Sequence, residues 1–111
     1  MHRFVQHGGQ LHISVISAGE LFTWSSRAKA SPKRAQTLTN LLRYVYVLDL
    51  TLEISQRFGE IRALLMDQGR ATPDLDLLIA ATALVHDLTL VTHNVQDFAT
   101  IPNLRIVDWL A

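Results

Sequence analysis

The chain has 111 residues, of which 49% are hydrophobic and 18% charged, and its formal net charge is zero. This length accommodates one hydrophobic core, and the composition excludes an intrinsically disordered protein. Because there is no cysteine, disulfides, thiolate metal ligands and thiol nucleophiles are excluded. Any catalysis must therefore use carboxylates, hydroxyls or histidines.

We expect a single domain that spans residues 1–111. No apolar run approaches the roughly 20 residues that cross a bilayer, and the first ten residues lack the apolar core of a secretory signal. Together with the lack of cysteine, these features predict a cytoplasmic protein.

The first predicted strand is the short, β-branched run LHISVI at residues 11–16. Ser17 and Glu20 follow it with the S-x-x-E spacing of a capping box, in which each residue satisfies a backbone amide of the other. This spacing predicts a helix that begins at Ser17 and runs to about Ala30.

The middle of the chain predicts two helices around a strand. Ser31 and Pro32 have the order of an N-cap and a first helical residue, so a second helix follows them and ends before the strand VYVLDL at residues 45–50. Residues 51–68 place apolar side chains at helical spacing, and Gly69 supplies a stop. We therefore expect a long amphipathic helix here.

The last third of the chain predicts a buried helix and two strands. Thr72, Pro73 and Asp74 form a helix start, with the threonine as cap and the acid near the positive end of the helix dipole. The helix that follows is apolar almost all round, as a helix packed on a sheet would be. LTLVT at 88–92 and RIVDW at 105–109 predict two strands joined by a loop.

Four short strands separated by helices predict an α/β fold with three layers, in which helices cover both faces of a mostly parallel sheet. In such sheets ligands bind at the carboxyl ends of the strands. The functional site is expected at that edge.

Acidic residues follow three of the predicted strands. Glu20 and Asp97 lie beyond strand ends, and Asp74 and Asp76 lie in the first turn of the buried helix. Capping and the helix dipole explain single acids at such positions without any chemistry. Asp76, however, interrupts an apolar series on a helix that should be buried, where a carboxylate needs a partner. Clustered carboxylates bind Mg²⁺ or Mn²⁺, and such ions assist phosphodiester hydrolysis.

Other site chemistries find less support. No histidine pair has the i, i+4 spacing of a zinc protease, and neither a G-x-S-x-G elbow nor a phosphate-binding G-x-x-x-x-G-K-[ST] loop occurs. Residues 21–48 contain no acid, and the basic side chains in this segment could contact a phosphate backbone or simply face solvent. They are Arg27, Lys29, Lys33, Arg34 and Arg43.

Three segments resemble the PIN-domain ribonucleases, especially the VapC-type toxins of toxin–antitoxin pairs. They are SVISAGEL at 14–21, PDLDLLIAATALVHDLTLVTHNVQDF at 73–98 and IPNLRIVDW at 101–109. The resemblance implies a quartet of acids that binds Mg²⁺ or Mn²⁺ at the carboxyl edge of the sheet and cleaves RNA. The positions that match these acids are Glu20, Asp76 and Asp97, with Asp74 as a less regular neighbour. Thr92 and Asn94 match polar residues that line the same pocket.

The beginning of the chain departs from the family pattern. Family members begin with an apolar central strand that ends in an aspartate, and nothing before Leu11 matches it. Residues 1–7 resemble instead the end of the helix that would follow such a strand. We therefore expect a PIN-like domain that lacks its first strand and one metal ligand, with weak metal binding and reduced or lost activity. Trp24 also stands where the family commonly has glycine.

A vacant central position would leave two strands with unpaired edges, which are templates for pairing with another chain. We expect a homodimer, unless the two strands pair directly with each other. The competing functions are a metal-dependent endoribonuclease toxin that acts on RNA, a non-catalytic PIN-like protein that binds itself or an antitoxin, and a flavodoxin-like or receiver-like binding module.

Overall fold

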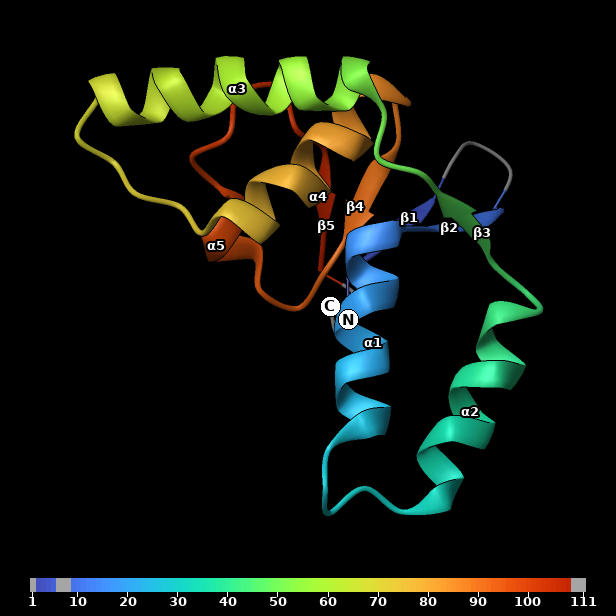
Figure 1. Cartoon of the computed structure of the whole chain (residues 1–111). Coiled ribbons are helices and arrows are strands. Elements are labelled where there is room, and N and C mark those ends of the chain that lie inside the picture. The colour runs from blue at the N-terminus through green and yellow to red at the C-terminus, as the bar shows by residue number, and fades with distance from the viewer. Residues whose placement is uncertain (1, 6–8, 109–111) are drawn as a thin grey trace.

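The computed structural model describes residues 2–5 and 9–108 and has a sheet with the strand order β3-β2-β1-β4-β5 (Figure 1). The strands are β1 (Arg3–Val5), β2 (Leu11–Ser14), β3 (Tyr46–Leu48), β4 (Thr89–Val91) and β5 (Ile106–Val107). The helices are α1 (Val15–Ser26), α2 (Pro32–Leu42), α3 (Leu52–Asp67), α4 (Asp74–Val85) and α5 (Val95–Phe98).

The sheet is mixed, and its central strand runs against the other four. β2 pairs with β3 and β4 pairs with β5 in parallel, whereas β1 is antiparallel to both β2 and β4. The predicted α/β class and the mostly parallel sheet are therefore confirmed.

β1 changes our expectation for the beginning of the chain. Arg3–Val5 form a strand and not the end of a helix, and they fill the central position that we expected to be vacant. The remainder of that predicted helix end, Met1 and residues 6–7, lies outside the described residues. The physical reason is burial, because Phe4 has no exposed surface in the sheet and belongs to the main core cluster. The inner edges of β2 and β4 are thus paired with β1 within the same chain.

The start of α1 also differs from the prediction. The strand before it ends at Ser14, whose Oγ accepts a hydrogen bond from the Ser17 amide at 2.9 Å, and the helix begins at Val15. Ser17 is therefore inside the helix, and the capping box that we predicted with Glu20 is wrong. Glu20 is an exposed residue in the helix interior and has no capping role.

α1 ends at Ser26, before the predicted end near Ala30, whereas the remaining helix boundaries lie close to their predictions. Ser31 precedes α2 with Pro32 as its first residue, and the Thr51 hydroxyl caps α3 by accepting from the Ile54 amide at 3.2 Å. Gly69 follows α3 with a φ of 69°, a conformation that suits glycine.

Near α4 and beyond it the differences are small. Pro73, and not Thr72, is the N-cap of α4. The predicted loop between the last two strands contains the short helix α5. The last predicted strand is shorter than expected, and Trp109 lies outside the described residues.

The core lies between the sheet and the pair α3 and α4. Phe4 from β1 and Leu90 from β4 belong to one buried cluster with Ile54, Ile79 and Phe98 from the helices. α1 and α2 extend away from this core as a helical hairpin (Figure 1). Within the described residues, no helix is both long and apolar enough to cross a membrane.

Candidate acidic site at the sheet edge

The site lies where the carboxyl ends of β2 and β4 meet the amino end of β1. Arg3 pairs with Val91 in the antiparallel register, so His2, just before β1, lies beside Thr92, just after β4. Reversal of β1 therefore brings the residue before the strand to this edge, where a parallel strand would bring the residue after it.

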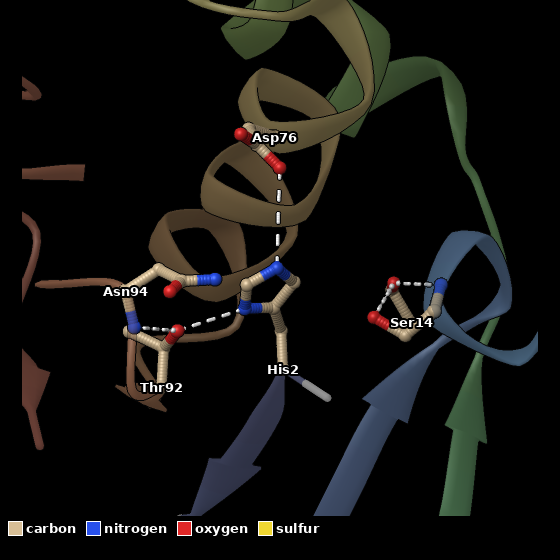
Figure 2. A network of polar contacts seen from close by, with 6 residues as sticks. His2, Ser14, Asp76, Thr92 and Asn94 are labelled. Atoms are coloured by element: carbon tan, nitrogen blue, oxygen red, sulfur yellow. Dashed lines mark hydrogen bonds and ion pairs between the residues drawn. The ribbon is translucent and has the colours of Figure 1, made fainter. Parts of the chain in front are cut away.

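His2 forms the centre of the site, as Figure 2 shows. Its Nδ1 lies 2.9 Å from Oγ1 of Thr92, and its Nε2 faces Asp76 at 3.9 Å from Oδ1. The ring also packs edge-on against Phe98, with 5.0 Å between ring centroids. Three segments, α4, the end of β4 and α5, thus hold one imidazole.

Thr92 connects His2 to the turn after β4. The Thr92 side chain is fully buried, and its Oγ1 accepts a hydrogen bond from the Asn94 amide at 3.0 Å. Of the two predicted pocket residues, Thr92 therefore contacts His2 through its hydroxyl, whereas Asn94 bonds to Thr92 through its backbone amide.

The electrostatics of His2 and Asp76 are governed by burial. Loss of hydration lowers the pKa of His2 below its ordinary 6.5, although the Asp76 carboxylate opposes this shift. Burial likewise raises the pKa of Asp76 above 3.8, against the attraction of His2. Both shifts point away from an ion pair, so at neutral pH His2 is a neutral imidazole.

The other predicted acids surround His2 at longer range. Glu20 on α1 and Asp97 on α5 both raise the pKa of His2 electrostatically, and Asp97 also raises that of Asp76. Asp74 has a different neighbour, because its carboxylate accepts a hydrogen bond from Nε of Arg62 on α3 at 3.2 Å. The structure thus brings Glu20, Asp76 and Asp97 toward His2 and places Asp74 in a separate pair.

Two cavities border the site. One of about 300 Å³ is lined by His2, Ser17, Glu20, Leu21 and Trp24. The other, of about 620 Å³, is lined by His93, Asn94, Val95, Gln96, Asp97 and Asp108. Glu20 and Asp97 therefore border different cavities.

The comparisons with known proteins identify the family. The PIN-domain family model matches residues 2–104. The chain belongs to the PIN-domain family. It is 33% identical over 97 residues to "Ribonuclease VapC2" of Rickettsia felis, and the matched region covers 87% of this chain and 72% of that protein. It is 30% identical to "tRNA(fMet)-specific endonuclease VapC" of Salmonella typhimurium, over 96% of this chain and 81% of that protein.

A solved structure agrees with this assignment to the VapC-type PIN domains. The VapBC-1 structure from nontypeable Haemophilus influenzae superposes with a TM-score of 0.86 at 29% identity, over 96% of this chain and 80% of that one. The predicted resemblance is therefore confirmed.

The basic segment of this PIN domain lies on the α1–α2 hairpin. Arg27, Lys29 and Lys33 are exposed. Arg34 is partly buried, because its guanidinium donates to the Trp24 carbonyl at 3.0 Å and lies 5.2 Å from the centre of the Trp24 ring. Arg43, just after α2, is exposed as well, so four of the five cations of this segment are accessible to a ligand.

Sequence reasoning missed His2. A histidine near the beginning of a chain carries no motif, and its place in the site depends on the direction of β1. Ser14 and Ser17 were also missed as a pair, although both are buried and share a hydrogen bond of 3.1 Å between their hydroxyls. Ser17 lines a cavity together with His2, and Ser14 is shown in Figure 2.

Proposed function

We propose that this chain is a single-domain, VapC-type endoribonuclease toxin with low activity. The observation that carries this proposal is the placement of Glu20, Asp76 and Asp97 around one point of a PIN-domain sheet edge. The RNA substrate class is proposed from the ribonuclease names of its relatives. We propose the cytoplasm, where RNA is available, as its compartment.

The proposed cofactor is Mg²⁺ or Mn²⁺, which carboxylate oxygens suit by their chemistry. The placement of these side chains fits such an ion poorly. Across residues 2–5 and 9–108, no group of three or more histidine or acidic side chains is close enough to hold a metal ion. This is the physical reason for proposing weak metal binding and low activity.

The chain's own residues suggest how RNA would be held. Exposed Arg27, Lys29 and Lys33 on the hairpin can contact phosphates. The cavity beside Glu20 has Trp24 in its wall, and aromatic rings stack on unpaired bases. These features favour a single-stranded region of RNA over a regular duplex.

Cleavage of RNA in the presence of Mn²⁺ tests the proposal. Single-stranded RNA and a folded tRNA are incubated with the chain and with the Asp76→Asn variant, which has nearly the same shape but no carboxylate. We expect slow cleavage that falls at least about tenfold in the variant, since loss of a group that stabilises the transition state typically has effects of this size or larger. Equal cleavage by both proteins, or none by either, would remove the enzymatic proposal.

A second candidate function is antitoxin binding without catalysis. It is favoured by large exposed apolar side chains on and beside the α1–α2 hairpin, with Phe22 52% and Tyr44 82% exposed, and by the VapBC complexes among the similar structures. Size-exclusion chromatography with light scattering, with and without a co-expressed antitoxin, tests it. A complex of defined mass supports antitoxin binding, whereas a dimer of the chain alone supports the self-association that we predicted.

A further inference from the structure

We propose that His2 occupies the position of the cation in this site, so that a divalent ion binds Asp76 only after the imidazole has left. The inference rests on the proposed function for the identity of the site, but the affinity of that site for a metal ion can be measured separately from RNA cleavage. It offers a reason why the acids at this PIN-domain edge, among the residues that the structure describes, form no group that could hold a metal ion.

The first step is the direction of β1. Because this strand is antiparallel to β4, its amino end lies at the edge where the acids gather. The side chain that reaches this edge is an imidazole, and its Nε2 faces the Asp76 carboxylate at 3.9 Å. The space in front of that carboxylate is therefore held by a nitrogen of the protein itself.

The second step is the tautomer of His2. The buried Thr92 hydroxyl already accepts from the Asn94 amide, and among the described residues His2 Nδ1 is the acceptor available to its proton. We therefore assign the hydrogen bond as Thr92 O–H donating to Nδ1, which leaves the ring proton on Nε2. The Nε2–H then points its positive end toward Asp76, as a cation would present its charge.

The same assignment argues against His2 as a metal ligand. A ligating histidine needs a lone pair on the nitrogen that faces the ion, and it usually donates through its other nitrogen. With the tautomer assigned above, the lone pair lies on Nδ1, which is the nitrogen 2.9 Å from Thr92 Oγ1, and Nε2 carries the proton. His2 is arranged to substitute for the ion and not to bind it.

The imidazole of His2 is held by contacts on two sides. Its side chain is only 13% exposed, and it is fixed by Thr92 on one side and by the edge-on contact with Phe98. An ion must break these contacts before it reaches Asp76. If the closed state is ten times more populated than the open one, the apparent affinity for the ion falls about tenfold.

Isothermal titration with Mn²⁺ tests the inference on the full chain, prepared without additional residues at its amino end. We compare the original protein with His2→Ala and with His86→Ala, a matched control because His86 is an exposed histidine at the opposite end of α4 from Asp76. We expect His2→Ala to bind Mn²⁺ about tenfold more tightly, and His86→Ala to bind as the original does. Weaker binding by His2→Ala would make His2 a ligand, and unchanged binding would make it a bystander; both overturn the inference.

NMR of the unchanged protein decides the case if His2→Ala fails to fold. Saturating Mg²⁺ should shift the side-chain nitrogen signals of His2 to those of a solvent-exposed imidazole, and persistence of the Thr92-bonded state at saturation would overturn the inference. Metal affinity is measured here without RNA. Tighter binding without RNA cleavage would thus sustain this inference and contradict the proposed function.

Discussion

Nδ1 of His2 lies 2.9 Å from Oγ1 of Thr92, although the two residues are ninety positions apart in the chain. The contact exists because β1 runs against β4, which sets the residue before one strand beside the residue after the other. The direction of β1 therefore decides which residue reaches this edge of the sheet. With β1 antiparallel to β4 it is the residue before the strand, and with a parallel strand in the same place it would be the residue after it.

The first prediction concerns the titration of His2 in metal-free protein. Because burial outweighs the attraction of Asp76, the imidazole should titrate below pH 6.5 when followed by NMR in the presence of EDTA. Asp76→Asn should lower the pKa of His2 further, since the carboxylate that favours the charged ring is then absent. A midpoint above 6.5 would mean that the ion pair, and not burial, governs the site.

The second prediction is that Asp76→Asn stabilises the metal-free fold at pH 7. The folded-state pKa of Asp76 is raised, so the folded chain holds its proton more tightly than the unfolded chain. The protonated Asp76 side chain therefore contributes to the stability of the fold below pH 3.8, and this contribution is lost as the pH rises through the folded-state pKa. At pH 7 the ionised, partly buried carboxylate disfavours folding, and the amide removes that cost.

Urea denaturation at two pH values measures this effect. We expect the variant to be more stable than the original at pH 7 and to lose that advantage at pH 3, where Asp76 is protonated in both the folded and the unfolded chain. An equal gain at both pH values would show that its cause is packing and not charge.

The sequence predicted the α/β class, the helix starts at Ser31 and Thr51, and the stop at Gly69, because those signals are local. Capping hydroxyls, a proline in the first turn and a glycine after the last turn act on their own neighbours. The Ser17 capping box failed because Ser14, three residues earlier, offered an equivalent hydroxyl. Local spacing alone could not choose between them.

The direction of β1 could not be predicted, because no local signal in a three-residue strand specifies it. What holds Arg3–Val5 is tertiary: two neighbouring strands and a core that buries Phe4. Glu20, Asp76 and Asp97 were predicted to gather because each follows a strand at the same edge. His2 has no such signature and becomes a site residue through the reversed strand alone.

The third prediction tests that central strand. Phe4→Ala should destabilise the fold by about 3 to 5 kcal/mol, the usual cost of removing a fully buried phenylalanine. Leu52→Ala, at a leucine that is 87% exposed, is the control and should change stability by less than about 0.5 kcal/mol. Chemical denaturation gives both values. If the two variants were equally stable, Phe4 would not be part of the core and β1 would not hold the sheet together.

The last prediction concerns the basic hairpin. In EDTA, which prevents metal-dependent cleavage, replacing Arg27, Lys29 and Lys33 by alanine should weaken binding of single-stranded RNA about equally for different sequences, because phosphate contacts carry no base information. Each lost contact reduces the slope of log affinity against log salt by about 0.7, so three contacts reduce it by about 2. Fluorescence anisotropy over a range of salt concentrations measures both effects.

Arg57→Ala is the control for this prediction, because it removes an exposed cation from α3 and should leave the slope unchanged. A slope that stays the same in the triple variant would assign these three side chains to solvent and would exclude the hairpin as the proposed RNA-binding surface.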